Sequence, residues 1–222
     1  MRFSPSRRTV VTTSAATIHA ANAATRSPAI LRLAAATLAT ATIAGGLSVV
    51  STGTATAAVT PEQCTAGKAA AEAGRPVENI EAFRLPRTFI NKDHELRIYF
   101  KGENPNPAAV TKAVNDWNTA LKGRVTLRMV TDPSEADVTM VNDPGPLSWY
   151  AGRLDIRTGL IEVYLSRLRG ESAPRVVGHE LGHALGAGDT HCANILMSGQ
   201  PDDDPAYSPT PLDVAIVLQG RY

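Results

Sequence analysis

Residues 179–189 read HELGHALGAGD, and this stretch guides the interpretation of the whole chain. Its first seven residues are the end of a segment, residues 173–185, whose apolar positions recur at helical spacing. Side chains four positions apart project from one face of an α-helix, so His179 and His183 are expected to point the same way. Two imidazoles at this spacing can bind one metal ion, with Zn–N distances of about 2.0–2.1 Å. The stretch therefore predicts a metal-binding helix.

Two acidic residues complete the predicted site. Glu180 is too close in sequence to His179 to bind the same metal ion together with the two histidines. It can take a proton from a water on the metal, which makes it the candidate general base. Gly186 is expected to end the helix, because glycine adopts positive φ at little cost. Asp189 is the next side chain able to ligate. Two histidines and one carboxylate leave a fourth position for water, so Zn²⁺ is the predicted metal.

Each piece also has an ordinary interpretation. The two histidines and the glutamate occur together on solvated surface helices, Gly186 alone is a helix cap, Asp189 alone is a turn residue, and Met197 alone fills space in a core. Their order and spacing favour the metal site. His191 has three interpretations: another third ligand, a group near the substrate, or a loop residue without a role. We favour the second, because histidine can donate a hydrogen bond to an oxyanion.

The remaining pattern predicts a chain of strands and helices. A short alanine-rich helix is expected at 64–73, and a longer helix begins near Pro107 and stops at Gly123. A loop containing Trp149 and Tyr150 follows the third strand. Strands are expected at residues 96–100, 125–130, 136–141 and 159–165, and further helices at 173–185 and 211–219.

The head of the chain has the composition of an export signal. Residues 33–50 carry no charge, arginines precede them, and the small residues ATAA at 55–58 follow. This predicts a secretory leader over 1–57, an arm or pro-segment over 58–94 and a catalytic domain over 95–222. The alternative is a transmembrane anchor, which the many Ala, Thr, Gly and Ser residues disfavour. We therefore expect a secreted, extracellular protein without a stable membrane anchor.

The charge balance excludes one class of partner. The first 60 residues hold five arginines and no acid, which leaves 17 basic and 21 acidic residues in the rest of the chain. This surplus of acids disfavours binding to nucleic acid or to an anionic membrane. With 43% hydrophobic and 19% charged residues, the chain can bury an ordinary globular core.

The chain has two cysteines, Cys64 and Cys192. Disulfides persist outside the cytosol, so one bridge between them is the favoured interpretation. The alternative is that the Cys64 thiolate caps the metal until a pro-segment is removed.

The string His-Glu-x-x-His-x-x-Gly-x-x-Asp, followed by LMS at 196–198, resembles the metzincin metalloproteases. The aspartate in the third-ligand place resembles the snapalysins, small secreted neutral proteases of actinobacteria. The similarity covers about residues 95–222. It implies an α+β zincin fold with a twisted mixed sheet, an active-site helix, a Met-turn at Met197 beneath the zinc and a C-terminal helix. It also implies that residues 161–165 form the edge strand of the cleft and pair with a bound peptide.

The sequence departs from the snapalysin pattern in three places. Members often carry proline before the third-ligand aspartate and an aromatic residue two positions after it, whereas this chain has Gly188 and His191. They also tend to have a short-range disulfide near the Met-turn. Here only Cys192 is available in that region, so any bridge within the chain must reach back to Cys64.

These observations predict a secreted zinc metalloendopeptidase that acts as a monomer on protein or peptide substrates. Zinc would be held by His179, His183 and Asp189, and Glu180 would deprotonate the attacking water and pass the proton to the leaving amine. The alternative is a secreted, zinc-stabilised binding module without protease activity. Glu180 distinguishes the two, because metal binding does not need it and hydrolysis does.

Overall fold

The computed structural model describes residues 59–143, 151–199 and 204–222. The predicted leader, 1–57, and the loop containing Trp149 and Tyr150 therefore lie outside the described residues, apart from the end of that loop. Among the described residues, we find no helix with the length and apolar character needed to span a bilayer.

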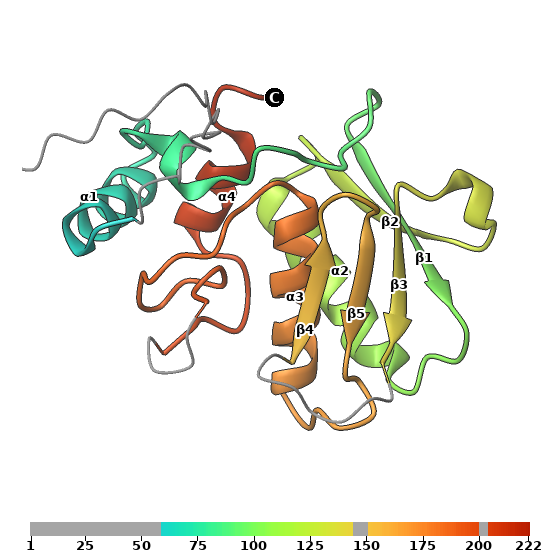
Figure 1. The fold of residues 1–222 in the computed structure, drawn as a ribbon. Coiled ribbons are helices and arrows are strands. Elements are labelled where there is room, and N and C mark those ends of the chain that lie inside the picture. Colours follow the sequence, from blue (N-terminus) through green and yellow to red (C-terminus); the bar gives the residue numbers. More distant parts are fainter. Residues whose placement is uncertain (1–58, 144–150, 200–203) are drawn as a thin grey trace, which may run out of the picture. The chain divides into compact units, whose positions relative to one another are not determined.

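A five-stranded mixed sheet carries the fold (Figure 1). Four strands run parallel, and the fifth pairs antiparallel at one edge. Buried and partly buried positions alternate along the central strands, so one face of the sheet packs on helices and the other is more open. The strands are β1 Glu95–Lys101, β2 Thr126–Val130, β3 Val138–Asn142, β4 Gly152–Asp155 and β5 Leu160–Val163, in the order β2-β1-β3-β5-β4.

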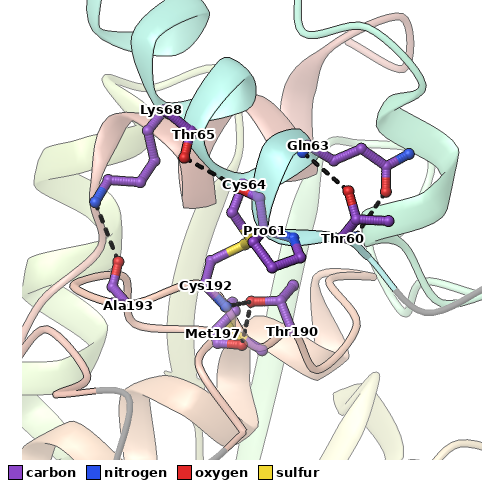
Figure 2. Close-up of a disulfide and its surroundings, with 10 residues drawn as sticks. All are labelled: Thr60, Pro61, Gln63, Cys64, Thr65, Lys68, Thr190, Cys192, Ala193 and Met197. Atoms are coloured by element: carbon purple, nitrogen blue, oxygen red, sulfur yellow. Dashed lines mark hydrogen bonds between the residues drawn. A yellow bond between two sulfur atoms is a disulfide. The ribbon is translucent and has the colours of Figure 1, made fainter.

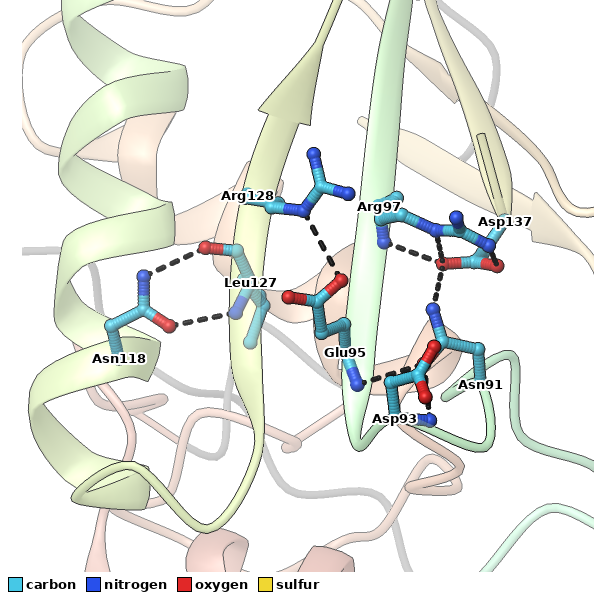
Figure 3. A network of polar contacts seen from close by, with 8 residues as sticks. All are labelled: Asn91, Asp93, Glu95, Arg97, Asn118, Leu127, Arg128 and Asp137. Carbon is cyan, nitrogen blue, oxygen red and sulfur yellow. Dashed lines mark hydrogen bonds and ion pairs between the residues drawn. The ribbon is translucent and has the colours of Figure 1, made fainter. Parts of the chain in front are cut away.

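Two helices, α2 Pro107–Leu121 and α3 Ser172–Ala184, pack against each other and against the sheet. The buried Trp117 indole on α2 donates a hydrogen bond of 2.8 Å to the Gly178 carbonyl on α3. The Asn118 side chain exchanges two hydrogen bonds, 2.9 and 2.8 Å, with the backbone of Leu127, which joins α2 to β2 (Figure 3). These contacts fix α3, the helix that carries the histidine motif.

The remaining helices pack together beside this layer. They are α1 Pro61–Glu72, α4 Pro211–Leu218 and the short 3₁₀ turn η1 Ile80–Phe83, and α1 and η1 both contact α4. A second 3₁₀ turn, η2 Pro133–Glu135, connects β2 to β3. Helix α1 begins three residues before the predicted start because Thr60 and Gln63 form a capping box (Figure 2). The Thr60 hydroxyl accepts from the Gln63 backbone, and the Gln63 side chain accepts from the Thr60 backbone.

A disulfide joins Cys64 on α1 to Cys192, with 5.3 Å between the two Cα atoms (Figure 2). The predicted bridge is therefore confirmed, and neither sulfur is available as a metal ligand. Close by, the Lys68 ammonium donates a 3.1 Å hydrogen bond to the Ala193 carbonyl. The bridge ties α1 to the chain that follows the histidine motif.

The edge of the sheet differs from the prediction. Residues 161–165 were expected at the edge, but β5 lies between β3 and β4, and β4 is the edge strand. The sequence pattern predicts no strand at 152–155, because GRLD is short and lacks an alternating apolar pattern. The other expectations for the class are confirmed: an α+β fold with a mixed sheet, a motif-bearing helix, a buried Met197 turn and a C-terminal helix.

Candidate metal centre

Helix α3 presents the motif because its apolar side is fully buried. Val177, Leu181 and Ala184 are completely inaccessible to solvent, while His179 and His183 are only partly buried. The buried side fixes the rotation of the helix about its axis. The two histidines therefore project toward the cleft, as the four-residue spacing predicts.

Three potential ligand atoms converge at this face. One nitrogen of His179, one nitrogen of His183 and one carboxylate oxygen of Asp189 lie within 4.8 Å of one another. Asp189 Oδ1 is 3.1 Å from His179 Nε2 and 3.4 Å from His183 Nε2. Gly186, with φ of 94°, ends the helix and turns the chain back so that position 189 reaches the histidines. These three residues could hold a metal ion.

The other ring nitrogens show how the imidazoles are oriented. His179 Nδ1 lies 2.8 Å from the Leu196 carbonyl, and His183 Nδ1 lies 2.9 Å from the Ala187 carbonyl. A carbonyl oxygen only accepts, so each Nδ1 carries the proton and donates. Each Nε2 then faces the Asp189 carboxylate, with a lone pair in the neutral ring and with an N–H donor in the protonated ring. Hydrogen bonding of the second ring nitrogen to a carbonyl is the usual support for a metal-binding histidine.

The electrostatics favour a cation at the centre of this group. Burial lowers the pKa of His183, but the Asp189 and Glu180 carboxylates outweigh this effect and raise that pKa to about 9. Burial raises the pKa of Asp189, but hydrogen bonds from the two imidazoles hold it well below its usual range. Positive charge between the three side chains therefore stabilises their arrangement.

Glu180 has an oxygen without a partner. The residue is 4% exposed, and burial raises the pKa of its carboxyl. Its Oε2 atom is buried and has no hydrogen-bond partner within the part of the chain that the structure describes. Buried polar atoms are nearly always paired in folded proteins, so an unpaired oxygen beside possible metal ligands needs an explanation. Glu180 also lines the candidate cleft, so this oxygen is a candidate proton acceptor.

The methionine turn, residues 193–198, packs beneath α3. Met197 is fully buried, and a side chain added at Gly182 on α3 would overlap its sulfur. Glycine at this position thus allows the turn to approach the helix closely. The Leu196 carbonyl, which orients His179, belongs to the same turn.

Asp213 fixes the methionine turn, and sequence reasoning missed it. Its fully buried carboxylate accepts hydrogen bonds of 3.0 Å from the backbone N–H groups of both Leu196 and Met197. It also accepts from the backbone and hydroxyl of Thr210, both at 2.7 Å. The spacing of Thr210 and Asp213 predicts a capping box at the start of α4, but it gives no sign of the bonds to the turn.

The candidate site opens into a cleft of about 460 Å³. Edge strand β4 forms one wall, and Leu196, Ser198 and Pro205 form part of another. A Cβ atom at Gly152 of β4 would lie 2.8 Å from both Cγ and Oε1 of Glu180. The strand can therefore lie directly against Glu180 only because residue 152 has no side chain.

His191 lies apart from this group. It is exposed, it is not one of the three converging residues, and it does not line the cleft. The structure therefore places Asp189, and not His191, beside the two histidines, and gives no support for the favoured interpretation of His191 as a group near the substrate.

Solved structures of other proteins are similar to part of this chain. No protein-family model and no curated protein sequence matches this chain. The structure is similar to archaemetzincin from Methanopyrus kandleri, with a TM-score of 0.41 and 16% identity over 58% of this chain and 96% of that one. It is also similar to high choriolytic enzyme 1, a hatching-enzyme zinc protease of the medaka fish Oryzias latipes, with a TM-score of 0.30 and 19% identity over 47% of this chain and 50% of that one. Both TM-scores are below 0.5, so neither similarity shows what this chain does, and the resemblance to snapalysins stays a prediction.

Proposed function

We propose that this protein is a secreted, snapalysin-like zinc metalloendopeptidase. One observation carries the proposal: the ligand atoms of His179, His183 and Asp189 converge in a cleft beside the unpaired Glu180 oxygen. A binding module stabilised by metal has no use for a buried carboxylate oxygen without a partner, and such an atom costs stability. Hydrolysis does need it, which favours the enzyme.

The donor set suits zinc. Two imidazole nitrogens and one carboxylate oxygen are common ligands of catalytic zinc, and they leave at least one position free. When bound, zinc would polarise the carbonyl of the peptide bond to be cut and acidify the attacking water. The hydrogen bonds from His179 and His183 to backbone carbonyls would keep the rings oriented for this role.

Glu180 would carry the proton. Its unpaired oxygen would accept a proton from the attacking water and then donate it to the nitrogen of the leaving amine. Gly152 and the buried surroundings hold the carboxyl in place, so the same group can act in both steps. No side-chain nucleophile takes part, and no covalent intermediate with the protein is formed.

The substrate would bind along β4. Among the strands that the structure describes, β4 pairs only with β5, so its outer edge would offer backbone donors and acceptors to an extended peptide. Because Gly152 touches Glu180, a peptide in that position would lie beside the proposed base. Main-chain pairing gives affinity with little demand on substrate sequence, so proteins and peptides are the proposed substrates.

The setting of this activity is also a proposal. The Cys64–Cys192 disulfide and the predicted leader over 1–57 support an extracellular protein. The surplus of acidic residues after position 60 argues against a nucleic-acid partner. We expect the enzyme to act as a monomer.

The experiment measures zinc and proteolysis separately. The wild-type protein should cleave casein and lose this activity to a chelator. Glu180→Gln should keep zinc, because no ligand is lost, and lose activity. Asp189→Ala should lose zinc, whereas His191→Ala should keep it. A Glu180→Gln protein that loses its metal would make Glu180 a ligand, and zinc loss in His191→Ala but not in Asp189→Ala would refute the ligand set.

A further inference from the structure

The N-terminal segment, residues 59–90, precedes the first strand, and the sequence leaves open whether it is an arm or a removable pro-segment. We propose that this segment is a permanent part of the metal centre, in which Arg84 positions the metal loop, residues 184–189. The inference rests on the proposed function, because it concerns the loop that presents Asp189.

The N-terminal segment lies alongside the metal loop and is hydrogen-bonded to it. The Gly188 N–H donates to the Phe83 carbonyl at 2.8 Å, and the Leu85 N–H donates to the Gly186 carbonyl at 3.0 Å. A third bond, 2.9 Å, runs from the Phe89 N–H to the Ala184 carbonyl. The chain between the second histidine and the aspartate is therefore held along its length by residues 83–89.

This pairing reaches the ligands themselves. Arg84 forms an antiparallel bridge with Ala187, and the Ala187 carbonyl accepts the hydrogen bond that orients His183. Gly188, directly before Asp189, uses its N–H for the bond to Phe83, which proline could not make. The residue directly before the candidate ligand Asp189 is thus hydrogen-bonded to the N-terminal segment.

The Arg84 side chain connects the N-terminal segment to the C-terminal helix α4. The guanidinium is 2% exposed and donates to the carbonyls of Ile216 at 2.6 Å and Gln219 at 2.5 Å, and to the Glu81 carboxylate. A buried guanidinium with these fixed partners leaves its backbone little freedom. The Arg84 backbone, and with it the bridge to Ala187, is thus located by α4.

The same segment does not block the cleft. Leu85 lines the cleft wall, and it is the only residue of 59–90 that does so, while the cleft beside the ligands keeps its volume of about 460 Å³. Phe83 is fully buried within the same core cluster as α3 and α4. The Cys64–Cys192 disulfide ties the segment to the chain beyond the metal loop. Removing the segment would open the core and release the loop, without clearing a path for substrate.

Paired variants of the full chain test the role of Arg84. Arg84→Met keeps the bulk of the side chain but removes its donors, and Arg97→Met is the control, because Arg97 pairs with Asp137 next to β3 and not with the metal loop. Both should lower the melting temperature. Only Arg84→Met should weaken zinc binding, by about tenfold or more, and change the visible absorption of the cobalt-substituted protein. Equal zinc affinity and unchanged cobalt spectra in the two variants would overturn the positioning role.

A second measurement covers the case in which Arg84→Met does not fold. The active protein recovered after export should begin before Cys64, by N-terminal sequencing, and should contain the Cys64–Cys192 peptide in a non-reducing map. An active, zinc-containing protein that begins after Phe89 would show that the segment is removable. A wild-type protein that binds zinc but cleaves no peptide would refute the proposed function and leave this inference standing.

Discussion

Gly152→Ala places a methyl group between the edge strand and the proposed base. The added Cβ would lie 2.8 Å from Cγ and Oε1 of Glu180 and 3.1 Å from its Cδ. Comfortable contacts between carbon atoms are about 3.5–4.0 Å, so the carboxyl must move by about 1 Å. A misplacement of about 1 Å in a catalytic group costs about 100-fold in rate, or about 2.7 kcal/mol of barrier.

The assay is kcat/KM for a quenched fluorescent peptide, with zinc content and melting temperature measured on the same samples. Zinc should stay bound, because no ligand changes. Gly67→Ala in α1 is the matched control, since its added Cβ would meet no atom closer than 3.4 Å, and its activity should stay near that of the wild type. If Gly152→Ala kept its zinc and its full activity, Glu180 would not be the base in the position described.

Three further predictions concern the supporting structure. Gly182→Ala should lower the unfolding free energy by about 1–3 kcal/mol in thermal melts, because the new methyl overlaps the buried Met197 sulfur. Asp213→Asn replaces one carboxylate oxygen with an NH₂ donor that faces the backbone N–H groups of the methionine turn. The free energy of unfolding in urea should therefore fall by about 2–4 kcal/mol, and the affinity for zinc should fall as well. Burial raises the pKa of Asp137, but hydrogen bonds from Arg97 outweigh this and hold the pKa below its usual value (Figure 3). This carboxylate therefore stabilises the fold above about pH 3.9 and loses its effect as the pH falls through the lowered pKa, so the stability difference between wild type and Asp137→Asn should shrink in acid unfolding experiments.

The parts of the site that depend on local geometry could be predicted from the sequence. His179 and His183 face one way because helical spacing alone determines it, and Gly186 brings Asp189 back within three residues of the helix end. The Cys64–Cys192 pairing was also predictable, because the chain contains no other cysteine. In each case the spacing or the number of the residues allowed few other arrangements.

The parts that depend on distant residues could not be predicted. Asp213 contacts the methionine turn across 16 and 17 residues, and Arg84 reaches α4 across 132 and 135 residues. Edge strand β4 depends on pairing with β5, since its own four residues show no strand pattern. The close approach of Gly152 to Glu180 follows from that pairing and has no sequence signal of its own. Tertiary structure decided these features.

The two cysteines of the disulfide lie far apart in the sequence, so the bond can form only late in the synthesis of the chain. Cys64 is synthesised 128 residues before Cys192, which at about 5–20 residues per second is a wait of roughly 6–25 s. Arg84 waits slightly longer, because its acceptor Ile216 follows it by 132 residues. Throughout that interval α1 lacks α4, the helix that it contacts in the folded protein. The first-made and last-made parts of the described chain therefore complete each other, and loss of only the last dozen residues would leave the N-terminal segment without its partner helix.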